Sequence, residues 1–363
     1  MKKNEILIIH GTNYKEMARQ ILARADVAAE LPDKKAKIAL KPNLVTDSEP
    51  SMGGTTHPEL LAGAIEYFQE NGFSDITIME GSWVGTRTGS AYRAAGYDQV
   101  CERYGVPFVD LKGDKTTEYD CAGMKIRICS RAMEADYMVN MPVLKGHCQT
   151  VITCALKNNK GIIPDSEKRR FHSMGLHKPI AHLNVKAPNS FILVDNICGD
   201  LDFEEGGNPV RMDRILGFKD PVLCDSFVCD CMGYELSDVP YIGMAEALGV
   251  GSADLGKAEI IYLNEAEKGS RRFPMTRRVQ QLAAFTDPKD ACSACYGSLI
   301  HALNRLNDEG RLRRGKPEIA IGQGYQGKEG EIGVGRCTSC FRKTLKGCPP
   351  SASEMIRFLE ENW

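Results

Sequence analysis

Short apolar runs alternate with longer segments of helical periodicity along the first third of the chain. The apolar runs have the length of β-strands and occupy residues 6–9, 38–40, 76–79 and 108–111. Segments 14–31, 58–71 and 89–104 lie between them and carry apolar side chains at spacings of three and four residues, as amphipathic helices do. This recurrence predicts an α/β fold, a mostly parallel sheet with flanking helices.

The same kind of pattern continues through the middle of the chain. Residues 118–129 alternate like an antiparallel pair of strands, and the runs 137–144 and 191–195 again have the composition of buried strands. A short helix is expected at 245–248 and a late strand at 260–263. These elements extend the predicted α/β body.

A change in composition near residues 267–278 divides the chain. The segment is rich in lysine and arginine and lacks repeated aromatic residues, which is typical of a solvated linker. The alternative is a docking surface for an acidic redox partner. We predict an α/β body over residues 1–266 and a small cysteine-rich module over residues 267–363. Within the module we expect a helix at 294–306, a strand at 318–321 and a glycine-rich wrap around a metal centre at 322–335.

Five of the fourteen cysteines fall in the last quarter of the chain, as Cys292-x-x-Cys295, Cys337-x-x-Cys340 and Cys348 followed by proline. Two intervening residues let one turn direct both thiolates at the same metal, and a Cys-Pro pair ends bacterial ferredoxin motifs. We therefore predict a 4Fe–4S cluster. The alternative is a structural zinc held by the two pairs, although the forty-one residues between them exceed the zinc-ribbon interval. A third interpretation is five unrelated buried thiols.

Charge and composition narrow the class of protein. The 46 basic and 48 acidic residues give a formal net charge of -2, which provides no global attraction to nucleic acid or to an anionic membrane. No apolar run approaches the length that spans a membrane, and the first residues do not read as a secretion signal. Fourteen cysteines without such a signal favour reduced thiols over a disulfide scaffold. We expect a cytoplasmic protein that binds neither nucleic acid nor membrane.

Polar residues follow the predicted strands at the edge where ligands bind in open α/β folds. Lys41 and Asn43 end the second strand, His57 precedes the second helix, and Glu80 ends the third strand. We expect these groups to face one crevice, with His57 and Glu80 in catalysis and Lys41 and Asn43 in substrate binding. The alternative is an ion pair between Lys41 and Glu80 at the sheet edge.

A second set of polar residues follows the run 137–144, which would otherwise be buried. The set contains Lys145, His147, Thr150, Lys157, Asn158 and Lys160. Three lysines beside an imidazole suit a substrate carboxylate or phosphate, and an imidazole titrates near neutral pH. We predict catalytic roles for Lys145 and His147, with His147 transferring a proton, and substrate-binding roles for the others and for His172. The alternative is a structural polar network that ties strand to helix.

Together these residues resemble the family of the domain of unknown function 362 (DUF362), over roughly residues 37–235. The resemblance rests on Lys41-Pro42-Asn43, Lys145-Gly146-His147, Leu156-Lys157-Asn158 and an aspartate-rich segment from Asp195 to Asp225. Asp195 joins the substrate-binding candidates. Family members with a cysteine-rich extension are described as iron–sulfur or ferredoxin-like proteins, which implies that the metal ligands are Cys292, Cys295, Cys337 and Cys348. Cys340 departs from that pattern and is the alternative third ligand.

Three functions fit these features. The one we predict is an iron–sulfur redox protein, which transfers electrons to a partner protein or acts as an oxidoreductase on a small anionic substrate in the crevice. The second is a non-redox lyase or hydrolase with a structural zinc or iron–sulfur site. The third is a non-catalytic protein for metal delivery or a scaffold.

Overall fold

The computed structural model describes residues 1–264, 277–313, 315 and 317–363. Most of the predicted break at 267–278 therefore lies outside the described residues. The chain divides into two compact units. The first, which we term the body, comprises residues 1–168 and 177–275, and the second, the C-terminal unit, comprises residues 169–176 and 276–363. Among the described helices, none combines the length and the hydrophobicity that a membrane crossing requires.

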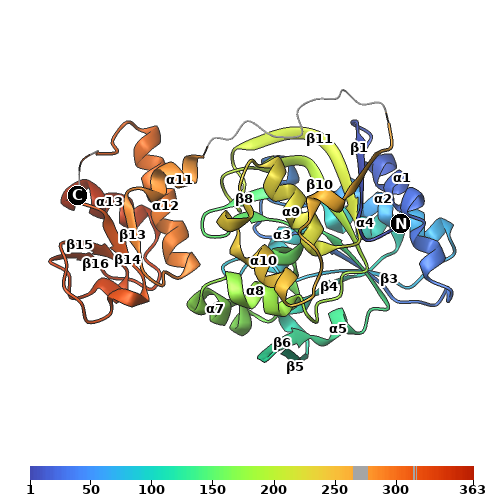
Figure 1. Cartoon of the computed structure of the whole chain (residues 1–363), viewed down its shortest axis with the longest axis horizontal. Coiled ribbons are helices and arrows are strands. Elements are labelled where there is room, and N and C mark those ends of the chain that lie inside the picture. Colours follow the sequence, from blue (N-terminus) through green and yellow to red (C-terminus); the bar gives the residue numbers. More distant parts are fainter. Residues whose placement is uncertain (265–276, 314, 316) are drawn as a thin grey trace. The chain divides into compact units, whose positions relative to one another are not determined.

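The body is built on one large sheet (Figure 1). This sheet has eight strands, in the order β12-β1-β11-β10-β7-β2-β3-β4. The strands are β1 (Glu5–His10), β2 (Ile38–Pro42), β3 (Ile76–Glu80), β4 (Phe108–Asp110), β7 (Tyr137–Met141), β10 (Phe191–Asp200), β11 (Pro209–Phe218) and β12 (Glu259–Tyr262). Only β11 runs antiparallel to its neighbours in this sheet. The predicted α/β class with a mostly parallel sheet is thus confirmed.

Helices and two small hairpins surround this sheet. The helices up to the end of the body are α1 (Tyr14–Ala25), α2 (Pro58–Glu70), α3 (Thr88–Ala94), α4 (Tyr97–Tyr104), α5 (Ser130–Met133), α6 (Ala155–Asn158), α7 (Asp165–Met174), α8 (His177–Leu183), α9 (Pro221–Cys231) and α10 (Pro240–Ala247). The hairpins are β5 (Thr116–Cys121) with β6 (Met124–Cys129), and β8 (Lys145–His147) with β9 (Val151–Thr153). The first hairpin confirms the antiparallel pair predicted at 118–129.

Two predicted helices are shorter than expected. The helix predicted at 14–31 ends at Ala25, because Asp26 takes a left-handed conformation with φ of 55°, and a 3₁₀ turn at Val27–Glu30 follows. The helix predicted at 89–104 divides into α3 and α4. In both cases the apolar spacing continues through the break, so the periodicity did not reveal it.

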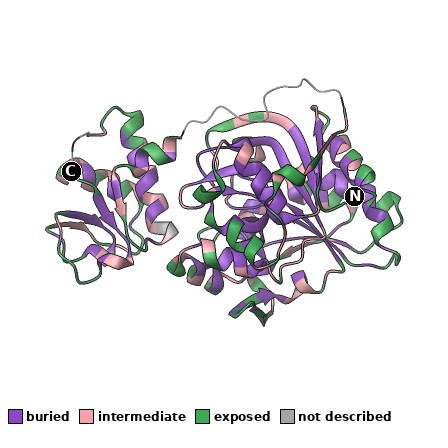
Figure 2. Ribbon diagram, in the orientation of Figure 1, coloured by how far each residue is buried: buried purple, intermediate pink, exposed green. Residues whose placement is uncertain are grey.

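Helices cover both faces of the sheet. Ile21 of α1 lies over Gly217 of β11, and Phe227 of α9 contacts Phe218 of the same strand with ring centroids 5.8 Å apart. Adjacent residues of a strand point to opposite faces, so α1 and α9 pack on opposite sides (Figure 1). The central strands are consequently buried throughout (Figure 2).

The C-terminal unit has a smaller sheet of its own, in which all neighbouring strands are parallel. Its strands are β13 (Thr286–Pro288), β14 (Ile319–Ile321), β15 (Ile332–Val334) and β16 (Lys343–Leu345), in that spatial order. Its helices are α11 (Arg278–Ala283), α12 (Ser293–Asp308) and α13 (Ala352–Asn362). The predicted helix at 294–306 and strand at 318–321 correspond to α12 and β14.

Candidate functional site

A buried ion pair joins the carboxyl ends of two neighbouring strands. Lys41 Nζ of β2 donates to Glu80 Oε2 of β3, and neither side chain is more than 3% exposed. Glu80 also accepts a hydrogen bond from Gly81 N at 2.7 Å, and Gly161 lies so close to its carboxylate that a Cβ atom there would clash. Burial lowers the pKa of Lys41 and raises that of Glu80, and the charge of each partner opposes these shifts. The two residues form the ion pair that the sequence suggested as an alternative.

Asparagine side chains connect the ends of β2 and β7 to helix α6. Asn43 Nδ2 donates to Asn158 Oδ1 at 2.8 Å, and Asn158 Nδ2 donates to Asn140 Oδ1 at 2.7 Å. Lys145 Nζ donates to Asn43 Oδ1 at 2.7 Å and to Gly54 O at 2.6 Å. All three asparagines and Lys145 are buried. Because each amide both donates and accepts, the chain fixes Lys145 and helix α6 relative to the sheet edge.

His147 is held as a neutral imidazole that donates from Nε2. Its Nδ1 accepts hydrogen bonds from the backbone N–H groups of Gln149 and Thr150, at 3.0 Å each. Its Nε2 lies 3.0 Å from Glu204 Oε2. Burial, together with the charge of Lys157, lowers the pKa of His147 to about 4. At neutral pH His147 is therefore a hydrogen-bond donor, and this arrangement favours anion binding over the proton transfer predicted for it.

The carboxylate that His147 contacts belongs to the 201–208 loop, which connects β10 to β11. Lys157 Nζ donates to Glu204 Oε1, and Lys145 Nζ donates to the backbone oxygen of Glu204 at 2.8 Å. Although burial opposes ionisation, Lys157 and the His147 hydrogen bond hold the pKa of Glu204 well below its usual range. Burial lowers the pKa of Lys145 to about 8 and that of Lys160 to about 7. We name these five residues, Lys145, His147, Lys157, Lys160 and Glu204, the polar cluster.

A second histidine is paired with an aspartate from β10. His57 Nδ1 lies 2.9 Å from Asp195 Oδ2, and the backbone N–H of His57 donates to the same oxygen at 2.7 Å. Burial lowers the pKa of His57, but the Asp195 carboxylate outweighs this effect and the net shift is upward. His57 therefore holds a proton at higher pH than a free imidazole does.

Most of the candidate residues of the body meet at one sheet edge. Lys41 pairs with Glu80, and the chain of asparagines reaches Lys145. Thr150 supports His147 through its backbone, while its hydroxyl donates to Ile152 O at 3.1 Å. His172 belongs to segment 169–176, which groups with the C-terminal unit and not with the polar cluster.

Three residues of this region were not identified as candidates from the sequence. Asn140 lies within the buried strand β7, and a polar side chain inside such a run is a signal that could have found it. Lys168 Nζ donates to Gly81 O at 2.8 Å and to Ser82 O at 2.9 Å, beside Glu80. Glu204 lies in a loop, and no local pattern distinguishes a loop carboxylate that folds back over lysines.

The cysteines of the C-terminal unit follow the ends of its parallel strands. Cys292 begins helix α12 after β13, and Cys295 lies in the first turn of that helix. Cys337 lies in the 3₁₀ turn Arg336–Thr338 directly after β15, where Gly335 has a φ of 92° that favours glycine. Cys348 follows β16. The strands are parallel neighbours, so these ends converge on one edge of the small sheet.

Four of the five cysteines in this unit influence one another electrostatically. Burial, followed by the nearby sulfurs of Cys292, Cys348 and Cys337, raises the pKa of Cys295 to about 12. The same burial and the sulfurs of Cys337 and Cys348 raise the pKa of Cys292. Cys340 and Cys348 are both exposed, but only Cys348 contributes to the pKa shift of Cys295. We name Cys292, Cys295, Cys337 and Cys348 the cysteine quartet.

Side-chain amides accompany this quartet. Gln323 Nε2 donates to Cys292 Sγ at 3.4 Å, and Gln326 Nε2 donates to Cys337 Sγ at 3.6 Å. Hydrogen bonds to sulfur stabilise thiolate charge and tune the reduction potential of an iron–sulfur cluster. Thiolate donors at converging strand ends, with N–H groups directed at them, fit the ligand chemistry of such a cluster.

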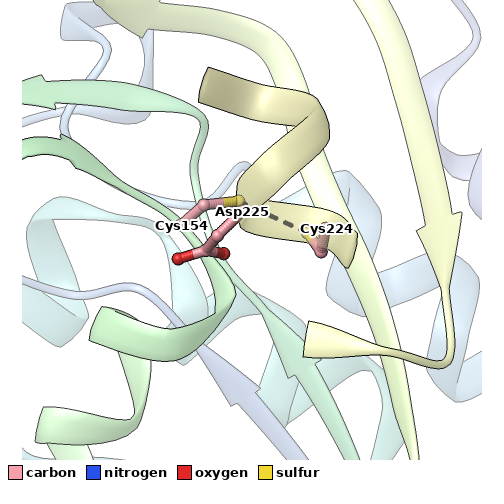
Figure 3. A group of neighbouring side chains, drawn as sticks. All are labelled: Cys154, Cys224 and Asp225. Carbon is pink, nitrogen blue, oxygen red and sulfur yellow. Dashed lines mark hydrogen bonds between the residues drawn. The ribbon is translucent and has the colours of Figure 1, made fainter. Parts of the chain in front are cut away.

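A third group lies within the body, between α6 and α9 (Figure 3). Cys154 Sγ and Cys224 Sγ are 3.7 Å apart, and their sulfurs and an Asp225 carboxylate oxygen lie within 4.8 Å of one another. Asp225 accepts a hydrogen bond from Leu156 N at 3.3 Å, and the nearby Tyr241 side chain stabilises its charged form. All three members of the group are fully buried. Since α6 carries Lys157 and Asn158, these contacts also position the polar cluster.

Replacing Asp225 with Asn is expected to change how stability depends on pH. Burial raises the pKa of Asp225 from 3.8 to about 7, so the folded state holds this proton more tightly than the unfolded state. The tighter proton binding stabilises the folded state fully below about pH 4, and this stabilisation is lost as the pH rises towards 7. The total loss of unfolding free energy is about 4 kcal/mol, at about 1.4 kcal/mol for each unit of pKa difference between the folded and unfolded states. The side chain of Asp225→Asn does not ionise, so the variant does not lose this stabilisation. Its stability relative to wild type should therefore rise between about pH 4 and pH 7.

Chemical denaturation of both proteins at pH 4.5, 6 and 7.5 measures this difference. Asp230→Asn, at the partly exposed end of the same helix, is the matched control and should show no such trend. A difference between Asp225→Asn and wild type that stays constant with pH would mean that Asp225 is ionised throughout, for instance by a bound cation.

Known proteins resemble parts of this chain. The lactate racemase apoprotein from Thermoanaerobacterium thermosaccharolyticum has a solved structure that matches with a TM-score of 0.37 and 16% identity, over 52% of this chain and 50% of that chain. The chain thus matches about half the length of that structure. A thylakoid-associated protein from Synechocystis sp. is 25% identical over 222 residues, which are 59% of this chain and 68% of the relative. The model of the domain of unknown function DUF362 matches residues 38–230, more than half of the sequence, and the chain belongs to the DUF362 family.

Proposed function

We propose that this protein is an iron–sulfur redox protein whose cysteine quartet holds a 4Fe–4S cluster and whose polar cluster binds a small anionic substrate. The observation that carries the proposal is the convergence of Cys292, Cys295, Cys337 and Cys348 from strand ends far apart in sequence, with Cys340 outside the group. When bound, a 4Fe–4S cluster exchanges single electrons with a donor or acceptor. Such a role requires a redox partner protein.

The forty-one residues between the two Cys-x-x-Cys pairs exceed the zinc-ribbon interval. Gln323 and Gln326 donate to two of the sulfurs, and such hydrogen bonds tune iron–sulfur clusters. Both features support a cluster over a single zinc ion. All fourteen cysteines are free thiols, which fits a reducing compartment such as the cytoplasm.

The polar cluster supports the anionic substrate. Lys145, Lys157 and Lys160 supply cations at the carboxyl edge of the sheet, and His147 supplies a fixed N–H donor. Burial, followed by the charge of Lys157, lowers the pKa of Lys160 to about 7. These residues would bind and orient an acid.

Anaerobic purification followed by iron, sulfide and zinc analysis tests the metal assignment. We expect a brown protein with about four iron and four sulfide per chain, as a 4Fe–4S cluster requires, whose visible absorbance bleaches with dithionite. A colourless protein that retains zinc after purification, and that takes up neither iron nor sulfide in reconstitution, would overturn the redox proposal. That result would favour the lyase, hydrolase or metal-delivery functions.

A further inference from the structure

We propose that the carboxylate of Glu204 occupies a carboxylate-binding site, which an external carboxylic acid takes over when the 201–208 loop moves aside. The inference rests on the anion-binding part of the proposed function and adds to it the class of ligand and an internal competitor. Glu204 would then be a reversible plug, and the external acid would have to displace it in order to bind.

The burial of the partners distinguishes the site from its occupant. The side chains of His147 and Lys157 are 3% and 2% exposed, whereas that of Glu204 is 20% exposed. The donors thus belong to the interior of the body, and the carboxylate covers them from the solvent side. One carboxylate oxygen meets the imidazole and the other meets the ammonium. Two donors for two oxygens of one planar group match a carboxylate.

The donors have supports that do not depend on Glu204. Lys157 Nζ also donates to Thr153 Oγ1 at 3.1 Å, and the two backbone N–H groups at Nδ1 fix the orientation of His147. Lys145 is held by Asn43 and by Gly54 O. Thr153 lies opposite Lys145 in the hairpin of β8 and β9. A site whose donors are positioned before the ligand arrives binds with little reorganisation.

The loop is fastened at both ends, and two further hydrogen bonds hold its backbone between them: Lys145 Nζ donates to Glu204 O at 2.8 Å, and Gly207 N donates to Met52 O at 2.9 Å. Asp200 accepts hydrogen bonds from the backbone N–H groups of Asp202 and Phe203 at 2.9 Å each, and from Asn208 N at 3.0 Å. Leu201 and Phe203 are buried, while residues 205 and 207 are exposed. The part that must move is short, from residue 204 to 207. Its movement breaks the hydrogen bonds at Glu204 O and Gly207 N, while the anchors at Asp200 stay in place.

The buried lysine charges explain why the Glu204 carboxylate occupies the site when no ligand is bound. Buried cations that lose their partner are strongly destabilising, because the desolvation of each charge is no longer offset. With the buried amines of Lys145 and Lys157 gathered in one place, Glu204 supplies the compensating charge. A ligand carboxylate would replace that charge one for one, so the exchange keeps the interior balanced.

The test is rescue of Glu204→Ala by acetate. We expect the variant to melt below the wild type in chloride buffer and to regain much of that loss in acetate at equal ionic strength. Calorimetry should show acetate or succinate binding at least about 10-fold more tightly to Glu204→Ala than to wild type. A wild type whose site is open in about a tenth of the molecules or fewer loses affinity in proportion to that fraction. Lys157→Met in the Glu204→Ala background should abolish this response. Glu205→Ala, at the adjacent exposed residue, is the matched control.

Each outcome separates the inference from the proposed function. If wild type and Glu204→Ala bind acetate equally, the acid binds elsewhere and the plug is wrong, while anion binding stands. If only the wild type binds, Glu204 is part of the ligand site and the plug is also wrong. If no carboxylate or phosphate binds to either protein, the anion-binding function itself fails. If Glu204→Ala does not fold, Glu204→Gln takes its place in the test. Glu204→Gln keeps the shape of the side chain, and this variant should bind acetate more tightly than wild type.

Discussion

Replacing any one of Cys292, Cys295, Cys337 and Cys348 with serine is expected to remove most of the iron from the purified protein, whereas Cys340→Ser should retain it. Each quartet thiolate supplies one corner of a 4Fe–4S cluster, and a hydroxyl is a poor substitute for a soft thiolate ligand. Cys340 is not among the cysteines that shift the pKa of Cys295, whereas Cys348, which is also exposed, is among them. Iron and sulfide analysis of anaerobically reconstituted variants gives the result directly.

The two members of one Cys-x-x-Cys pair form the sharpest comparison. Cys337 and Cys340 are three residues apart on the same turn, so general damage to the fold should affect both variants alike. Iron loss in Cys337→Ser with full iron in Cys340→Ser would assign the third ligand to Cys337. The reverse pattern would mean that the chain rearranges around the metal and that Cys340 is the ligand.

Spacing alone could not have made that distinction. Both cysteines of the pair have the same separation from Cys348 within a few residues, and either could ligate. What separates them is the small parallel sheet, in which Cys337 lies just after the end of β15, between β14 and β16. Strands of three residues carry too little pattern to be recognised in a sequence, and of this sheet only β14 was predicted.

The helices and strands of the body were predicted well where each has a uniform pattern of apolar residues along its own sequence. Strands β2, β3 and β4 begin at the predicted residues 38, 76 and 108. Strand β11 was missed, because its first half is exposed and carries charged residues, so that ten residues do not share one pattern. Its antiparallel direction follows from the direct connection through the 201–208 loop, which is too short for the crossover that parallel neighbours need.

The candidate residues of the body were predicted by position and not by partner. Lys41, Glu80 and Asn43 follow parallel strands, and the geometry of such sheets brings their ends together. Which atoms then pair depends on distant segments: Glu204 reaches the lysines from a loop about 47 residues after Lys157 in the sequence. A polar network of this kind is recognisable only once the chain has folded.

Removing one partner of the Lys41–Glu80 pair should be among the most destabilising single changes in the body. Lys41→Met leaves the Glu80 carboxylate buried without its ammonium partner, which costs about 3–5 kcal/mol of unfolding free energy. Lys168 lies nearby, but its Nζ already donates to Gly81 O and Ser82 O. Denaturant unfolding at neutral pH, with the signal of the body followed separately, measures the loss.

The pH dependence of this loss identifies its cause. Burial raises the pKa of Glu80 and Lys41 opposes the rise, so the Met variant lets that pKa rise further. A carboxyl with a raised pKa destabilises the fold only where it is ionised, so the penalty should be small below the ordinary value of 4.5 and should grow as pH rises. Adding Glu80→Gln should restore much of the stability at pH 7.5. Lys37→Met, at the exposed residue before β2, should change stability by less than about 0.5 kcal/mol. A Lys41→Met penalty that is independent of pH and is not relieved by Glu80→Gln would show that Lys41 stabilises the body through packing, and not through its charge.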